Sequence, residues 1–564
     1  MKRNFGIWAV LGLAASVSAQ MPNEVLLLVN KQSQASLKVA NVYAQTRKIP
    51  LRNMVWLDVP KSVYEGTATI TPEQFTQLIW EPANAAAKER GIDKQILAWV
   101  YSVDFPIRVK TSTNDRQQMS VGGLTFLRNK VPDLKAVEEG TYLSKLFGGP
   151  NQEFQKELPS FSLGARRYGV DEKVKFAEGL EYLHEGLGEE MPLPSMMLGY
   201  VGEKGTDVDT VLKTIQLGAA SDFRGLHSGI YFVKTDDVRS TCRDWQFEPN
   251  QQLLKRQGIS SVITNAIPAG ARNVMGVMMG AETVDPSKIG SFAPGAMAEH
   301  LTSWSAEFQK PQTKLTDWLK AGATGTAGSV VEPYSNFNKF PSARFFFYYG
   351  SGCTMLESFY QSLASPLQIL LLGDPMAKPY GLRIDAGLIG VSELSGAFTY
   401  MVKVDEALSN VNLLYAFYID GKEVQPFSDK GSYYLRADTL SDGYHRLQVA
   451  VCSTGTIRAY CLAEKEIVVN RKNRSVAFQQ SIEKLGEQKH GLKVDIKGEE
   501  KPKTIRLMQG ERILDEKPYA EDVVLALDER VVGEGPLQIQ AAAIFEDGME
   551  VRSAPAIMSV TFAE

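Results

Sequence analysis

The stretch Val25-Leu26-Leu27-Leu28-Val29 is an uninterrupted apolar run, as expected of a strand buried on both faces of a parallel sheet. Two further strand-like runs follow, Val55-Trp56-Leu57 and Ile96 to Tyr101. The segments between them, around 39–44 and 72–90, place apolar residues at helical spacing. This β-α-β-α-β order predicts a mostly parallel sheet with helices on its faces.

Residues 110–192 interrupt the alternation, because they are polar, contain glycine and show weak periodicity. They are interpreted as a long insertion that carries some helix. The alternation then resumes and ends in Ile369-Leu370-Leu371-Leu372, followed by Gly373-Asp374-Pro375. The pattern predicts strands at 196–201, 229–233, 261–264, 274–279, 326–331 and 369–372, and helices near 206–218, 295–303, 312–321 and 354–364.

After about residue 385 the helical periodicity gives way to the alternation of half-buried strands, as in Leu447, Val449 and Val451. Asp420-Gly421 and Gln509-Gly510 suit tight hairpin turns, because glycine tolerates positive φ. Two immunoglobulin-like β-sandwiches fit this pattern. The expected organisation is a signal peptide over 1–19, an α/β domain over 20–385, and all-β modules over 386–472 and 473–564.

The N-terminus has the three parts of a secretory signal. Lys2 and Arg3 precede an apolar run from Phe5 to about Ala15, and small residues follow up to Ala19. Because so short a run cannot cross the hydrocarbon layer as a helix, cleavage after Ala19 is expected instead of anchoring. The mature chain is therefore expected to be secreted or periplasmic, without a membrane span.

Composition limits the classes of function. The apolar fraction of 44% allows a large core, and the net charge of −4 argues against a nucleic-acid partner, which requires a basic face. Export permits disulfides, and Cys452 and Cys461 flank a turn-like Ser453-Thr454-Gly455-Thr456. A bridge between these two cysteines is one expectation, and two free thiols are the other.

The tract from about 295 to 380 contains the most distinctive motifs. It holds Ala296–Ser303, the glycine-rich run Gly322 to Pro333, and the closing Gly373-Asp374-Pro375. Over roughly residues 22–385, these motifs resemble an uncharacterised family of exported bacterial proteins, many from organisms with exosortase-type sorting systems. A more distant likeness is to the gingipain-type cysteine peptidases, and it implies a caspase-like α/β sandwich with a mostly parallel sheet.

The catalytic part of that second resemblance does not carry over. Gingipain-type enzymes place a histidine in a Gly-His-Gly loop and a cysteine after the next strand. This sequence lacks Gly-His-Gly, and the strand Val274 to Met279 runs into Gly280-Ala281-Glu282 where the cysteine would be expected. The first hypothesis is therefore a binding or assembly protein of the cell envelope, with an envelope or extracellular partner that the sequence does not identify.

The alternative hypothesis is a peptidase-like hydrolase. Cys353 precedes a predicted helix whose N-terminus would lower the pKa of its thiol, and His300 would act as its base. His300 and Ser303 also lie three residues apart on a predicted helix, and so share a face. The competing interpretations are that Cys353 is a small buried residue or pairs with Cys242, and that His300 packs locally.

The predicted binding residues are Thr302, Glu332 and Asp374, at the rim of the sheet where open α/β folds take ligands. No cofactor is expected. The five histidines are scattered, and the sequence has neither a His-x-x-x-His nor a Cys-x-x-Cys pair. A zinc site built from neighbouring ligands is therefore not expected.

Overall fold

The computed structural model describes residues 21–144, 146–148, 192–225, 228–405, 412–453 and 459–561. The expected signal peptide lies outside this range. So do residues 149–191 of the expected insertion and part of the turn between Cys452 and Cys461. Within the described residues, no helix is both long and apolar enough to span a membrane.

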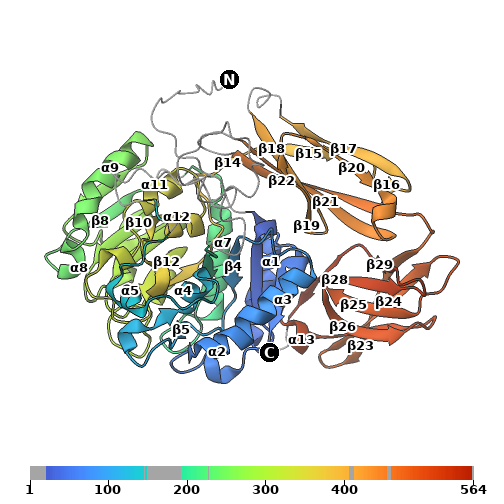
Figure 1. The fold of residues 1–564 in the computed structure, drawn as a ribbon, viewed down its shortest axis with the longest axis horizontal. Helices are drawn as coiled ribbons and strands as arrows, with labels where there is room; N and C mark the ends of the chain where they lie inside the picture. The colour runs from blue at the N-terminus through green and yellow to red at the C-terminus, as the bar shows by residue number, and fades with distance from the viewer. Residues whose placement is uncertain are drawn as a thin grey trace.

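The α/β part is built on one ten-stranded sheet of order β2-β1-β4-β7-β13-β12-β11-β10-β8-β9 (Figure 1). Neighbouring strands are parallel except β12 and β13, which are antiparallel. The large, mostly parallel sheet is thereby confirmed. Its strands are β1 (Val25–Asn30), β2 (Met54–Leu57), β4 (Ala98–Tyr101), β7 (Ser195–Met197), β8 (Ile230–Val233), β9 (Ser261–Thr264), β10 (Ala271–Gly280), β11 (Gly290–Leu301), β12 (Gly325–Ser329) and β13 (Ile369–Gly373).

Helices cover both faces of this sheet. The alternation within β1 shows how: Val25, Leu27 and Val29 pack with one set of helices, while Leu26 and Leu28 pack with the other. The first set is α1 (Gln34–Arg47), α7 (Val208–Ser221) and α10 (Leu315–Lys320). The second set includes α3 (Glu81–Glu89), α4 (Val121–Phe126), α8 (Val238–Thr241), α9 (Phe247–Arg256), α11 (Phe345–Gly350) and α12 (Met355–Ser362).

Shorter elements complete the α/β part. A small three-stranded sheet is formed by β3, β5 and β6. The predicted helical stretch at 72–90 is present, although its middle is a π-helical turn. These elements are α2 (Pro72–Phe75), η4 (Thr76–Trp80), α5 (Leu134–Glu139), β3 (Thr69–Ile70), β5 (Arg108–Val109) and β6 (Met119–Ser120).

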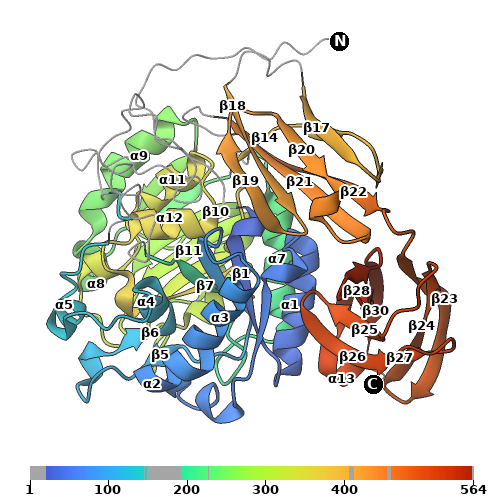
Figure 2. The same ribbon diagram turned by 45° about the vertical axis from the view of Figure 1, so that its right-hand side comes forward.

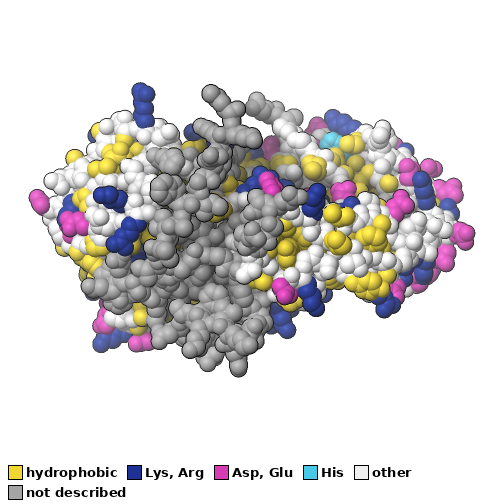
Figure 3. Space-filling model, turned by 90° about the horizontal axis from the view of Figure 1, so that it is seen from above, with side chains coloured by type: hydrophobic (Ala, Val, Ile, Leu, Met, Phe, Trp, Pro, Cys, Tyr) yellow, Lys and Arg dark blue, Asp and Glu magenta, His cyan; other side chains and the backbone are white. Residues whose placement is uncertain are grey.

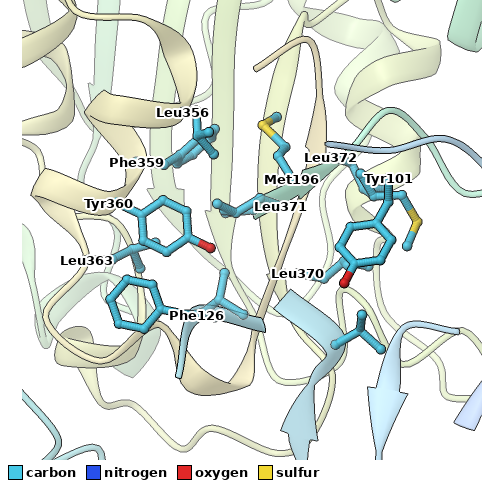
Figure 4. Close-up of a cluster of buried hydrophobic side chains, with 14 of the residues drawn as sticks. Tyr101, Phe126, Met196, Leu356, Phe359, Tyr360, Leu363, Leu370, Leu371 and Leu372 are labelled. Carbon is cyan, nitrogen blue, oxygen red and sulfur yellow. The ribbon is translucent and has the colours of Figure 1, made fainter. Parts of the chain in front are cut away.

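Figure 4 shows a part of the core in which side chains of α12 and β13 are buried together. Tyr360 of α12 stacks on Phe126 of α4, with ring centroids 5.1 Å apart. The hydroxyl of Tyr360 donates to the carbonyl of Ser195 at 3.0 Å and accepts from its N–H at 3.1 Å. The hydroxyl group of the buried Tyr360 therefore has hydrogen-bond partners, and these two hydrogen bonds connect α12 to β7.

The predicted helix near 295–303 is wrong, because residues 290–301 form strand β11. Pro294 and Gly295 break a helix, and Gly295 adopts φ 83°. A Cβ at Gly295 would lie 2.7 Å from the side chain of Ser221, so α7 approaches the strand closely there. The change matters for the site, since consecutive residues of a strand point to opposite faces.

Each all-β part has its own hydrophobic core, and a further cluster on the first part includes Met21 of the α/β part. Residues 382–469 form the first all-β part and residues 475–560 the second. The two parts share an eleven-stranded sheet, in which Gly443 of β21 pairs with Arg552 of β29. The strands are β14 (Leu382–Arg383), β15 (Ala386–Ile389), β16 (Glu393–Leu394), β17 (Ala397–Val404), β18 (Leu413–Ile419), β19 (Lys422–Ser428), β20 (Ser432–Arg436), β21 (Gly443–Ser453), β22 (Ala459–Val469), β23 (Ser475–Gly486), β24 (Lys489–Lys497), β25 (Thr504–Gln509), β26 (Arg512–Pro518), β27 (Val524–Asp528), β28 (Gly535–Ile544), β29 (Glu550–Arg552) and β30 (Ala556–Val560), with the short helix α13 (Glu529–Val532). Both predicted hairpins are present, as β18–β19 and β25–β26.

Both all-β parts fold back onto the α/β part (Figure 2). The ammonium group of Lys378 lies 5.2 Å from the ring centroid of Phe223 and 4.6 Å from that of Tyr460, which belongs to the first all-β part. The side-chain amide of Asn41 on α1 donates to the carbonyls of Val532 and Glu534 in the second part, at 2.9 and 3.0 Å. The chain is therefore held together by specific contacts between parts distant in sequence.

Candidate functional site

The imidazole of His300 lies inside the fold, with 1% of the residue exposed. Its Nε2–H donates to the carbonyl of Ala281 at 2.7 Å, and its ring lies 6.1 Å from that of Trp318 on α10. Nδ1 has no hydrogen-bond partner among the described residues. Burial lowers the pKa of His300 to about 4, so the ring is neutral at physiological pH. Because it is also inaccessible, it is a core residue in this structure.

The neighbouring Glu299 points to the opposite face of β11, where it pairs with Arg243 at 2.6 Å. Both side chains are almost wholly buried. Burial raises the pKa of Glu299 to about 7, against the opposing effect of the guanidinium. This buried ion pair was not predicted from the sequence. A shift of β11 by one residue would have placed His300, in place of Glu299, on the face of the sheet that Arg243 covers.

Cys353 lies on the same side of the sheet as Glu299, between α11 and α12, where it packs against Tyr348. Its sulfur accepts a hydrogen bond from Gln361 at 3.3 Å, and burial together with the charge of Glu357 raises its pKa well above the usual value. His300 packs on the α10 side instead. The sheet therefore separates the thiol from the imidazole, and the two do not form a catalytic pair in this structure.

The other predicted rim residues hold loops in place. Ser303 lies in the turn after β11 and shares no helical face with His300. The hydroxyl oxygen of Thr302 lies 2.6 Å from Oε1 of Gln312 and 3.0 Å from the carbonyl of Glu282, and its single proton is shared between these two acceptors. A carboxylate oxygen of Glu332 accepts the backbone N–H of Tyr334 at 2.9 Å, which is a local turn contact.

Asp374 is wholly buried and binds Arg47, at the end of α1. Nε of Arg47 donates to Asp374 at 2.9 Å, and Nη1 pairs with Asp222, after α7, at 2.6 Å. A Cβ at Gly218 would lie 2.0 Å from the Asp374 carboxylate, so α7 touches it directly. Burial raises the pKa of Asp374, while Arg47 opposes that rise. The carboxylate therefore joins α1, α7 and β13, and its hydrogen bonds are directed to protein groups.

The expected Cys452–Cys461 bridge is corrected by the register of β21 and β22. Cys452 pairs with Tyr460 and Cys461 with Val451, so the two thiols point to opposite faces of the sheet. Both cysteines are free. A disulfide would require the strands to slip by one residue.

A cleft of about 960 Å³ opens where the α/β part and the two all-β parts meet, between α1, β21 and β28. It is much larger than the recess of about 440 Å³ beside Tyr334, which is also lined by residues 117, 135, 138, 139 and 336. Its walls carry charged side chains of both signs, as does the right-hand end of the molecule in Figure 3. The size is within the range of ligand sites, although the lining is more polar than is usual for an apolar ligand.

Arg52 connects the three walls of this cleft. Its Nε donates to the carbonyl of Asp420 in the first all-β part at 3.1 Å, and its Nη2 pairs with Glu511 in the second at 3.1 Å. Glu511 also pairs with Arg552 at 2.9 Å. Burial alone would raise the pKa of Glu511, but the nearby guanidinium groups of Arg552, Arg52 and Arg90 lower it overall. The wall at this junction is thus a preformed ionic network.

His445, Asp420 and Ser441 line the same cleft and contain the groups of an acid–base–nucleophile triad. Nδ1 of His445 lies 2.7 Å from Asp420, but Nε2 is closer to the carbonyl of Ser441, at 3.0 Å, than to its hydroxyl, at 3.5 Å. A carbonyl only accepts, so Nε2 carries a proton. Although burial lowers the pKa of His445, Asp420 raises it overall. Because the Nε2–H group is directed to the Ser441 carbonyl, Nε2 has no free lone pair to activate the Ser441 hydroxyl in this arrangement.

The described residues contain no group of three or more His, Cys, Asp or Glu arranged to hold a metal ion. No known protein-family model matches the chain, and no curated protein matches its sequence. Among solved structures, one described as "Structure of Protease" is 10% identical, covering 79% of this chain and 97% of that one, with a TM-score of 0.35.

Two other solved structures also match, each over about a third of this chain. The Bacteroides ovatus mixed-linkage glucan locus protein SGBP-B, in complex with a heptasaccharide, is 15% identical over 31% of this chain and 47% of that one, with a TM-score of 0.19. The fibronectin(III)-like modules of Clostridium thermocellum CbhA are 12% identical over 32% and 89%, with a TM-score of 0.13. Likenesses at these TM-scores do not determine what the cleft binds.

Proposed function

We propose that this chain is an exported, non-catalytic binding protein whose ligand occupies the cleft between its three parts. The α/β part would be caspase-like without the usual Cys-His dyad, and the two all-β parts immunoglobulin-like modules that complete the site. Secretion or export to the periplasm rests on the N-terminal signal pattern. The cleft, lined by side chains from all three parts, is the observation that carries the proposal.

The chemistry of the predicted catalytic residues supports a non-catalytic role. General-base catalysis needs an accessible base within hydrogen-bond reach of its nucleophile. His300 is buried and neutral, and the sheet separates it from Cys353. The histidine that does line the cleft, His445, directs Nε2 to the Ser441 carbonyl at 3.0 Å, and its Nδ1 lies 2.7 Å from Asp420.

The test is site-specific photo-crosslinking in cells that produce the full chain. A benzophenone amino acid replaces Ile557, which is 61% exposed and lines the cleft, or Val262 on β9, which is 44% exposed and lies outside it. An adduct is expected from position 557 and none from position 262. The absence of any adduct at 557, or hydrolysis of a peptide library by the purified chain, would overturn the proposal.

A further inference from the structure

The acidic side chains of the cleft are mostly neutralised within the protein. Five of its six carboxylates form ion pairs with described residues: Asp420, Asp438, Glu511, Asp547 and Glu550. The sixth, Glu464, accepts a hydrogen bond from Gln448 at 3.4 Å. A ligand with basic groups would therefore compete with existing internal cations at most of these positions.

Two cationic side chains that line the cleft form no ion pair with described residues. Lys48, which ends α1 with φ 55°, is exposed and makes no ion pair with any described residue. Arg446 forms no ion pair in that part of the chain either, although it lies in the field of Glu464 and its Nε donates to Tyr444 at 3.4 Å. The charge that complements Lys48 is negative, so the site favours a ligand with an acidic group near the end of α1.

Two primary amides face the same region. Gln45 of α1 and Gln538 of β28 both line the cleft and the small recess beside it. Neither side chain has a hydrogen-bond partner among the residues that the structure describes. A primary amide both donates and accepts, so it matches the alternating N–H and C=O groups of an extended peptide backbone.

The apolar and aromatic side chains of the lining argue against a single-stranded nucleic acid as the ligand. Ile557 and Pro555 offer an apolar contact beside the amides, and Ile557 is 61% exposed. Among the described lining residues, Tyr444 is the only Phe, Tyr or Trp, and it is 8% exposed. Sites for single-stranded nucleic acid use exposed rings as stacking platforms, and this cleft has none to offer.

Granted the proposed function, we infer that the occupant of the cleft is an extended polypeptide segment with an acidic side chain beside Lys48. The amides of Gln45 and Gln538 hydrogen-bond its backbone, and a small apolar side chain packs on Ile557. The segment contacts the α/β part and both all-β parts at once, so its affinity depends on their docking.

The test is fluorescence anisotropy with the full mature chain at low ionic strength. The probes are labelled short peptides of alternating alanine and glutamate, alanine and lysine, or alanine and glutamine, together with an oligogalacturonate that has carboxylates but no amides. The Ala-Glu peptide is expected to bind tightest. Lys48→Glu should weaken it about tenfold, because attraction is replaced by repulsion, with a smaller effect at high salt.

Lys255→Glu, on α9 and exposed, is the matched charge control and should leave binding unchanged. Gln538→Ala should weaken the Ala-Glu and Ala-Gln peptides by a similar factor. Equal binding of the oligogalacturonate, preference for the lysine peptide, or no effect of Lys48→Glu would overturn the inference. If the photo-adduct at 557 forms while no peptide binds, the ligand class is refuted and the proposed function stands.

Discussion

Replacing Asp374 by Asn tests whether this carboxylate is a structural clamp instead of a binding group. Asn keeps the shape next to Gly218 but removes the charge that faces Arg47. The side chains of Arg47 and Asp374 are 5% and 0% exposed. Breaking such a buried pair typically costs about 3–5 kcal/mol. Arg47 retains Asp222, whose side chain is 17% exposed, so we expect the lower end, a loss of about 3 kcal/mol in the free energy of unfolding.

Urea denaturation followed by tryptophan fluorescence measures this loss. All seven tryptophans lie before residue 385, and the six beyond the expected signal peptide lie in the α/β part, so the signal reports on that part. Asp58→Asn is the matched control within the α/β part, because Lys31 and Asp58 form an ion pair at 3.0 Å whose side chains are 42% and 57% exposed. That exposed pair should contribute at most about 1 kcal/mol. If Asp374→Asn and Asp58→Asn cost the same, the clamp is refuted.

Three more predictions concern the buried imidazole, the buried thiol and the ionic junction. His300 has a pKa of about 4 when folded, so the unfolded chain takes up the proton first and stability falls from pH 6.5 towards pH 4. Between pH 7 and pH 5, the wild type should therefore lose about 2 kcal/mol more than His300→Gln in urea titrations, and equal losses would contradict this. Mass spectrometry should show Cys353 unmodified by iodoacetamide at neutral pH when folded and alkylated in concentrated urea; rapid labelling of the folded chain would disprove its burial. Glu511→Gln should weaken docking of the second all-β part by about 1–2 kcal/mol and speed hydrogen exchange at 529–533, whereas Glu516→Gln, on a more exposed pair, should not.

The sheet of the α/β part could be predicted from sequence because its strands are buried on both faces. A continuous apolar run such as Val25 to Val29 then separates clearly from the amphipathic helices. The same property explains why β11 was not predicted. Ala296, Met297 and Ala298 suit a buried helix as well as a buried strand, and only Pro294-Gly295 favoured the strand.

The spatial arrangement of the candidate catalytic residues could not be predicted from the sequence. It depends on which face of a strand each residue occupies, and neighbouring strand residues occupy opposite faces. Assigning 295–303 to a helix placed His300 and Ser303 on one face, whereas in a strand the neighbours Glu299 and His300 diverge. For the same reason, Cys452 and Cys461 lie on opposite faces of their sheet. A motif locates such residues along the chain, but a one-residue change of register reverses which side of the sheet they reach.

The cleft could not be predicted from the local spacing of residues either, because contacts between residues far apart in the sequence form it. Arg52 and the Asp420 carbonyl that it binds are 368 residues apart, and the ion pair with Glu511 spans a longer interval still. The turn Asp420-Gly421 was predicted as a hairpin, and its glycine adopts φ 82°. Nothing in that turn indicates that its carbonyl accepts a hydrogen bond from the α/β part.

Arg52 also determines how binding in the cleft would occur. Its guanidinium contacts the carbonyl of Asp420, the carboxylate of Glu511 and, at 3.4 Å, the carbonyl of Arg90, so one side chain holds all three parts before any ligand arrives. A ligand that enters such a site does not have to order the surrounding loops, and that saving strengthens its affinity. The folding of the two all-β parts back onto α1, and not a catalytic pair in the α/β part, is therefore the feature that supports the proposed binding role.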